Sequence, residues 1–61
     1  MPIVSIELIE GRSVDQKREM AKKITEAIVE VTKVPQEAVE VIFHDLKKEN
    51  YSKAGVLAID M

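Results

Sequence analysis

The sequence predicts an α/β (α+β) fold: one β-α-β unit with parallel strands, followed by a C-terminal β-hairpin or arm. Two segments, residues 1–12 and 39–46, show the alternating apolar pattern and the β-branched content of strands. Between them, in residues 14–32, apolar side chains recur every three or four positions, as on one face of a helix. Two strands joined by a long helix are expected to run parallel through a right-handed crossover. The 61 residues are expected to form a single domain, residues 1–61.

The first strand is expected to begin at the N-terminus and to end in a turn at Gly11. Pro2 is compatible with the first position of a strand, because no ladder donor is needed there. Side chains alternate between two faces, one with Val4, Ile6 and Leu8, the other with Ile3, Ser5, Glu7 and Ile9. The turn places Arg12 just beyond the end of the strand.

The helix is expected to run from about Val14 to about Thr32. Ser13 is a good N-cap, and Gln16 three residues later completes a capping box. The residue before Pro35 avoids the α region, which ends the helix. The predicted apolar stripe consists of Met20, Ala21, Ile24, Ala27, Ile28 and Val31.

The second strand is expected to cover residues 39–46, after a short connection at residues 36–38. Its faces alternate, one with Val39, Val41 and Phe43, the other with Glu40, Ile42 and His44. Residues 47–50 read as a polar turn, and Gly55 allows a tight bend. Residues 56–59 have little left to pack on within one subunit, so this arm is expected to reach a neighbouring subunit.

A chain of this length buries only about 60% of its unfolded surface, so an isolated subunit is marginally stable. It has no cysteine and therefore no disulfide, yet 46% of its residues are hydrophobic. Oligomerisation is the remaining way to stabilise so small a scaffold. The composition therefore predicts a homo-oligomer with buried subunit interfaces.

Charge and hydropathy exclude several partners. A net charge of −2 argues against a nucleic-acid partner, since such modules usually present a basic face. No apolar run approaches the ~20 residues of a membrane span, and no basic leader precedes the first strand. We therefore expect a cytoplasmic protein without a membrane partner. With one histidine and no thiol, no metal cluster is expected.

Pro2 is the first candidate for chemistry. If Met1 is removed, which a small second residue favours, Pro2 becomes a rigid terminal secondary amine. A free α-amino group has a reference pKa of about 7.7–8.0. Apolar walls or a nearby arginine would lower that pKa toward neutrality, where a general base works best. The alternative is that Pro2 only starts the strand.

Arg12 is the second candidate. A fixed guanidinium can bind a carboxylate through two hydrogen bonds and can stabilise a developing enolate; the alternative is a solvated loop arginine. Tyr51 lies in a polar segment and suits either a surface role or a pocket wall. Phe43 is expected in the core, and His44 on the strand surface rather than in catalysis.

Together these residues resemble the 4-oxalocrotonate tautomerase family, over essentially the whole chain. The similar segments are Pro2-Ile3-Val4, Leu8-Ile9-Glu10-Gly11-Arg12-Ser13, Asp15-Gln16-Lys17 and Tyr51…Gly55. The resemblance implies a β-α-β subunit that dimerises into a four-stranded sheet with two helices, commonly with three dimers in a hexamer. It also implies keto–enol isomerisation of an unsaturated 2-hydroxy/2-keto acid, without any cofactor.

By the same resemblance, Pro2 moves the proton, Arg12 binds a carboxylate of a small substrate, Tyr51 takes the aromatic pocket position and Ile9 helps to form the apolar wall. One residue departs from the pattern. Diacid tautomerases of this family carry a second arginine on the second strand, where this chain has Glu40. A carboxylate there repels a substrate carboxylate and favours protonated Pro2.

Two functions therefore stay open. The first is a cofactor-free tautomerase with Pro2 as proton shuttle, in which Lys53 or His44 could replace the missing cation. The second is an oligomeric scaffold or binding module that keeps the fold with little or no catalysis. Glu40 and a retained Met1, which would turn the Pro2 nitrogen into an amide, favour the second. The set of Pro2, Arg12 and Tyr51 favours the first.

Overall fold

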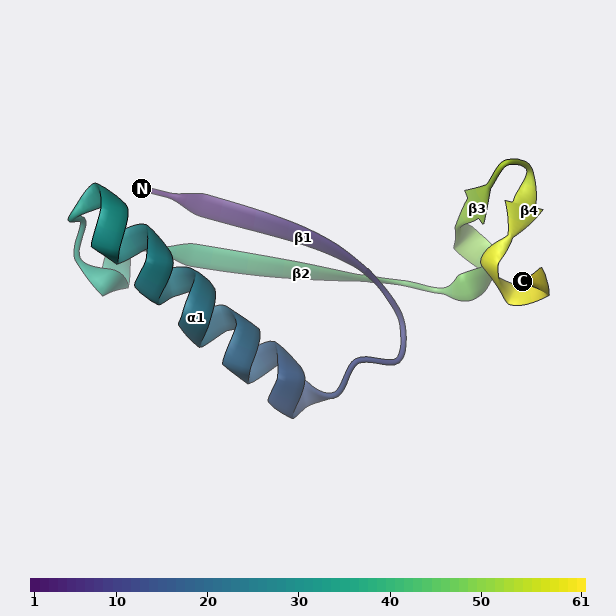
Figure 1. Ribbon diagram of the computed structural model, residues 1–61, viewed down its shortest axis with the longest axis horizontal. Helices are drawn as coiled ribbons and strands as arrows, with labels where there is room; N and C mark the ends of the chain where they lie inside the picture. Colours follow the sequence, from purple (N-terminus) through teal and green to yellow (C-terminus); the bar gives the residue numbers. More distant parts are fainter.

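The computed structural model describes all 61 residues, as a β-α-β unit followed by a C-terminal arm (Figure 1). The elements follow in this order: β1 (Ile3–Ile9), α1 (Val14–Thr32), the 3₁₀ helix η1 (Gln36–Ala38), β2 (Glu40–Leu46), η2 (Lys48–Asn50), β3 (Ser52–Lys53), β4 (Val56–Leu57) and η3 (Ala58–Asp60). The predicted helix and both main strands are confirmed, with strand ends shifted by one or two residues. None of the helices combines the length and the apolar character needed to cross a membrane.

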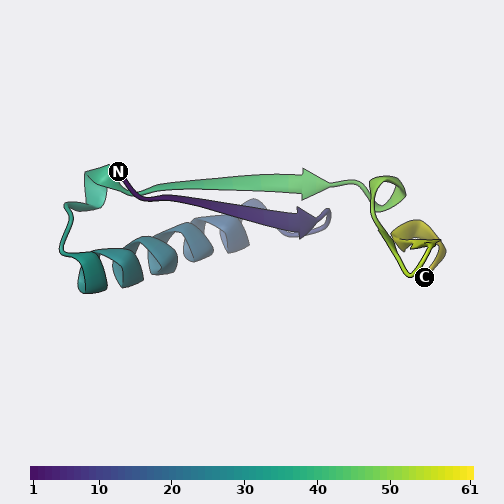
Figure 2. The ribbon, with the colours of Figure 1, turned by 90° about the horizontal axis from the view of Figure 1, so that it is seen from above.

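β1 and β2 pair in parallel, in a register that runs from Ile3 opposite Glu40 to Ile9 opposite Leu46. α1 lies along one face of this pair (Figure 2). The side chains on that face are half-buried, namely Val4, Ile6, Leu8, Val41 and Phe43. The other face is uncovered, with Ile3 62% and Ile42 42% exposed. Parallel sheets are normally covered on both faces, so this chain presents a surface suited to a partner.

The helix has the predicted N-terminal cap. The Gln16 backbone N–H donates to the Ser13 hydroxyl at 3.1 Å, and the Ser13 N–H donates to the Gln16 side-chain oxygen at 3.0 Å. At the other end, Lys33 adopts φ 65° and its N–H donates to the Val29 carbonyl. Both ends of α1 are therefore satisfied by residues next to it in the sequence.

The predicted apolar stripe of the helix was wrong at two positions. Ala27 and Val31 are exposed, Val31 to 81%, while Thr25 and Val29 are half-buried. Two strands spaced about 4.8 Å apart form a sheet too narrow to cover the whole stripe. The helix therefore covers the sheet with one side of the stripe and leaves the other side open.

The chain has no buried core: no residue is fully buried. Its radius of gyration is 14.6 Å, whereas a compact domain of this length would have about 10–11 Å. The arm, residues 47–61, projects beyond the end of β2 and away from α1 (Figure 1). It exposes apolar side chains to solvent, namely Tyr51, Val56, Leu57, Ile59 and Met61. Such a chain needs association to bury its apolar surface.

The arm contains the predicted hairpin. Ser52 pairs with Leu57 and Lys53 with Val56. The two residues between the strands, Ala54 at φ 53° and Gly55 at φ 82°, both have positive φ, as a type I′ hairpin turn requires. The sequence pointed to the bend at Gly55 and not to the left-handed conformation of Ala54.

Replacing Ser13 by alanine should lower the free energy of unfolding of the assembled protein by about 1 kcal/mol, because one N–H of the first helical turn loses its acceptor. Ser13→Asp keeps an acceptor at the N-cap and is the matched control, expected to change stability by about a few tenths of a kcal/mol at most. Chemical denaturation measures both. An unchanged free energy of unfolding in Ser13→Ala would show that the cap does not stabilise α1.

Candidate active site

Pro2 lies at the start of β1. Its side chain is half-buried, and its carbonyl oxygen accepts the backbone N–H of Glu40 at 2.9 Å. Glu40 begins β2 and is paired with Ile3, so it lies beside the N-terminus. The Glu40 carboxylate is exposed and makes no hydrogen bond or ion pair. This end of the strand pair therefore joins the predicted proton carrier to an unpaired negative charge.

Arg12 lies beyond the opposite end of β1, in the loop that leads to α1 (Figure 1). The rise of about 3.3 Å per residue makes Ile3 and Ile9 about 20 Å apart. A small carboxylic acid cannot reach both Pro2 and Arg12 of one chain. The structure brings these two predicted site residues together only if they come from different chains.

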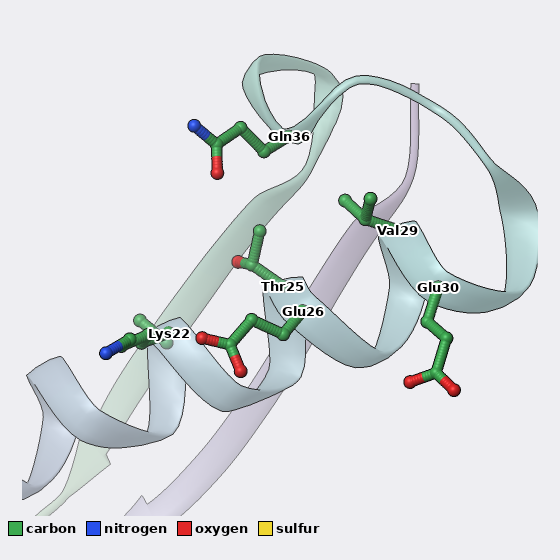
Figure 3. A pocket seen from close by; sticks show the side chains of 7 residues that line it. Lys22, Thr25, Glu26, Val29, Glu30 and Gln36 are labelled. Atoms are coloured by element: carbon green, nitrogen blue, oxygen red, sulfur yellow. The ribbon is translucent and has the colours of Figure 1, made fainter.

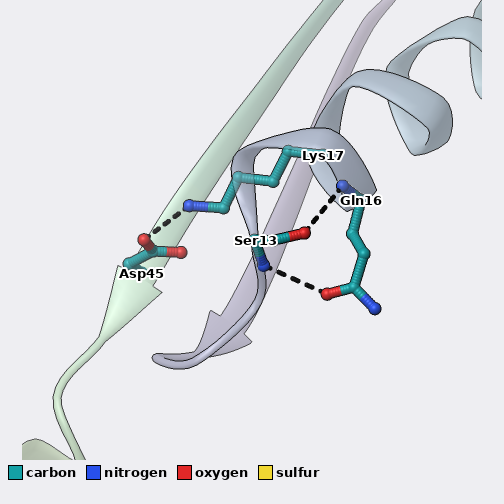
Figure 4. Close-up of polar contacts among 4 residues, drawn as sticks. All are labelled: Ser13, Gln16, Lys17 and Asp45. Carbon is teal, nitrogen blue, oxygen red and sulfur yellow. Dashed lines mark hydrogen bonds and ion pairs between the residues drawn. The ribbon is translucent and has the colours of Figure 1, made fainter.

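The loop that carries Arg12 is held on both sides. Gly11 adopts φ 121°, a conformation that side-chain-bearing residues avoid, and the capping box fixes the start of the helix. One turn into α1, the Lys17 ammonium bonds the Asp45 carboxylate of β2 at 2.6 Å (Figure 4). Arg12 itself is exposed and makes no hydrogen bond or ion pair. Its guanidinium donors are therefore free to bind an anion.

Tyr51 and Ile9 lie toward the same end of the strand pair as Arg12. Ile9 ends β1, is half-buried and faces Leu46 across the sheet. Tyr51 follows η2 in the arm and is 38% exposed, with its carbonyl accepting the Ala58 N–H at 2.8 Å. Ile9, Arg12 and Tyr51 thus all lie at or beyond the end of the strand pair opposite Pro2, with Tyr51 in the projecting arm.

The two residues considered as substitute cations lie elsewhere. His44 is on the uncovered face of β2, with Nδ1 2.9 Å from a Glu7 carboxylate oxygen. Lys53 lies in β3 of the arm and makes no ion pair. Neither is beside Pro2 within one chain, so the structure supplies no intrachain replacement for a cation at the position of Glu40.

Two open hollows flank α1. One, of about 570 Å³, lies between the helix and η1, with Lys22, Glu26 and Gln36 around it (Figure 3). The other, of about 400 Å³, is lined by six residues, namely Arg12, Gln16, Glu19, Met20, Lys23 and Ile24. Arg12 lines the second hollow, and Pro2 lines neither.

Two contacts near the Arg12 loop join residues far apart in the sequence. Lys17 bonds Asp45 across 28 positions, and the Lys48 N–H donates to a Glu10 carboxylate oxygen across 38 positions, at 3.0 Å. No local spacing marks either pair. Both depend on the parallel register that sets the end of β2 beside the end of β1.

Known proteins share this sequence and fold. The family described as "Tautomerase enzyme" matches residues 2–60. The 2-hydroxymuconate tautomerase of Comamonas testosteroni is 43% identical over 61 residues, covering 100% of this chain and 97% of the relative. A solved 4-oxalocrotonate tautomerase homologue superposes with a TM-score of 0.95 at 31% identity, covering 100% of this chain and 97% of that chain.

A second solved structure is a heterohexamer 4-oxalocrotonate tautomerase from Chloroflexus aurantiacus J-10-fl. It superposes with a TM-score of 0.90 at 26% identity, covering 100% of this chain and 98% of that chain. Sequence and fold therefore agree over almost the full length. The chain belongs to the tautomerase family, and it is an isomerase.

Proposed function

We propose that the protein is a cofactor-free tautomerase that interconverts the enol and keto forms of an unsaturated 2-hydroxy/2-keto acid. Membership of the tautomerase family, with Pro2 at the head of β1, is the observation that carries the proposal. Pro2 acts once Met1 has been removed, because only then is its nitrogen a basic amine. A substrate related to 2-hydroxymuconate is suggested by the name of the Comamonas relative.

The reaction needs one base and one anchor. The Pro2 nitrogen takes the proton from the 2-hydroxyl of the dienol, and the electron pair moves through the conjugated system as the keto group forms. The same proton returns from Pro2 to a carbon of the former dienol, so no atom is gained or lost. Arg12 holds the carboxylate beside the reacting enol and stabilises negative charge on its oxygen. Tyr51 and Ile9 supply apolar walls that limit access of water.

This chemistry requires more than one chain. Pro2 and Arg12 of one chain lie at opposite ends of β1, so the site combines Pro2 of one subunit with Arg12, Ile9 and Tyr51 of another. The uncovered sheet face and the apolar arm supply surface for such an assembly. The proposed assembly is a homohexamer of three dimers, each dimer forming a four-stranded sheet with two helices.

Glu40 favours a second candidate, an oligomeric scaffold or binding module of the same fold with little catalysis. Its unpaired carboxylate lies at the Pro2 end of the strand pair. There it would repel a second substrate carboxylate and favour the protonated amine. A chain that keeps Met1 would also lack the base. Measured turnover of an enol substrate by protein with a mature N-terminus separates the two candidates.

The protein should be an obligate oligomer, because no residue of the single chain is fully buried. Multi-angle light scattering at micromolar concentration should give a single oligomeric species, with a mass about six times that of one chain. Circular dichroism of the same sample reports whether the chain is folded. A folded monomer at that concentration would contradict the assembly.

Correctly processed Pro2→Ala and Arg12→Ala should each lose most of their turnover of 2-hydroxymuconate while remaining folded, because one lacks the rigid secondary amine and the other the carboxylate anchor. Unfolding the two variants together and refolding them as mixed oligomers should restore activity at about a quarter of the sites, those with both residues intact. Ultraviolet absorbance of the dienol follows turnover.

Each variant refolded alone serves as the control and should stay inactive. Mixed oligomers that contain both chains and show no recovery would mean that Pro2 and Arg12 act within one chain or that one of them has no role. Unchanged turnover by Pro2→Ala would remove the proposed base.

Glu40→Arg should raise kcat/KM for the diacid 2-hydroxymuconate more than for 2-hydroxypenta-2,4-dienoate, which has one carboxylate. A hydrogen bond to a charged group contributes roughly 1.5–3 kcal/mol, which is on the order of tenfold to a hundredfold in rate. Glu37→Arg, in η1, is the matched control, since it makes the same charge change at a nearby exposed site.

Steady-state kinetics at one ionic strength give the ratio of the two specificity constants for each variant. The Glu37→Arg ratio should equal that of the wild type. If the Glu40→Arg ratio equals it as well, Glu40 does not face the substrate.

A further inference from the structure

Glu10 connects the two parts of the chain that carry Arg12 and Tyr51. Its backbone N–H donates to the Leu46 carbonyl at 2.8 Å, which extends the β1–β2 ladder by one residue. Its carboxylate oxygen Oε2 accepts the backbone N–H of Lys48 at 3.0 Å. One residue thus contacts both the last residue of β2 and the first residue of η2.

The Lys48 contact is the N-terminal cap that η2 otherwise lacks. Lys47, at the N-cap position, makes no side-chain hydrogen bond to the 3₁₀ helix. The first N–H groups of a helical turn need acceptors from outside it, and the Glu10 carboxylate supplies one for Lys48. A hydrogen bond between a carboxylate and a backbone N–H is also stronger than a neutral one. Glu10 therefore holds the start of the arm, residues 47–61.

This cap spans the junction between the two substrate-contacting parts. Arg12 lies two residues after Glu10, across the conformationally special Gly11, and Tyr51 directly follows η2. Within one chain, the cap is the one hydrogen bond between the arm and the β-α-β unit. Without the cap, the position of Tyr51 relative to Arg12 would depend on the packing of the arm against neighbouring subunits alone.

We propose that Glu10 is a positioning residue: by capping η2 it sets Tyr51 relative to Arg12, so that one subunit presents carboxylate anchor and aromatic wall as a unit. The inference rests on the proposed function, because the two residues matter together only if they bind the same substrate. Glu10 does not touch the substrate, and its effect is on substrate binding rather than on proton transfer.

Glu10→Ala should raise KM for 2-hydroxymuconate about tenfold with kcat within about threefold of wild type, because the anchor and the wall lose their fixed separation. Glu10→Gln retains an oxygen acceptor and should recover most of the wild-type KM. Glu49→Ala is the matched control, since Glu49 is an exposed carboxylate in η2 that makes no hydrogen bond or ion pair. Simple loss of folded oligomer would lower kcat per chain and leave KM unchanged.

Hydrogen–deuterium exchange of the intact wild-type oligomer tests the contact without relying on activity. The Lys48 amide should be protected in the wild type. Its exchange rate should rise in Glu10→Ala and should equal the wild-type rate in Glu49→Ala. Wild-type KM in Glu10→Ala, or an unprotected Lys48 amide in the wild type, would overturn the inference. A different outcome is possible: the wild type is inactive, but its Lys48 amide is protected and loses that protection in Glu10→Ala. This outcome would confirm the cap and count against the proposed function.

Discussion

The parallel pairing of β1 and β2 is the constraint on which the rest of the molecule depends. In a parallel pair, the N-terminal ends of both strands lie side by side at one end of the sheet (the starting edge), and their C-terminal ends lie side by side at the other (the finishing edge). Residues next to a strand end therefore lie at one of these two ends. Pro2 and Glu40 share the starting edge, and the Arg12 loop and the arm share the finishing edge. The length of β1 then separates base from anchor, which is why the proposed chemistry needs a second chain.

The same pairing leaves the chain without a core. A two-stranded sheet gives α1 only a narrow surface, so Ala27 and Val31 stay open on one side of the helix. On the opposite face of the sheet, Ile3 and Ile42 are exposed to solvent, next to the Glu7–His44 pair. The single chain thus has two deficits with one cause. It leaves apolar surface exposed to solvent, and it keeps Pro2 apart from Arg12, so a second chain is expected to remedy both.

Charge divides the two edges as well. At the finishing edge Arg12 has no intramolecular partner, while neighbouring charges are paired, as Lys17 is with Asp45 and Glu10 with the Lys48 amide. At the starting edge, the Glu40 carboxylate has no ion pair and lies beside the chain's N-terminus. The two ends of the strand pair therefore carry free side-chain charges of opposite sign, which is why the proposed test of Glu40 compares a diacid with a monoacid.

Local sequence determined the elements and the identity of the candidate residues. The alternation in β1 and β2, the capping box of Ser13 and Gln16, and the resemblance around Pro2 and Arg12 all lie within short windows, where side-chain periodicity and backbone preference act directly. The bend at Gly55 followed in the same way, and the positive φ of Ala54 did not, because alanine carries no preference for it.

Only the tertiary structure decided where those residues stand. The side of α1 that meets the sheet was not readable from the apolar stripe. The contacts of Lys17 with Asp45 and of Glu10 with Lys48 depend on the register between β1 and β2. The two contacts join residues 28 and 38 positions apart, and no sequence spacing encodes such a distance. The register itself is set by packing α1 on one face of the strand pair, because a slip of one residue would turn every apolar side chain away from the helix.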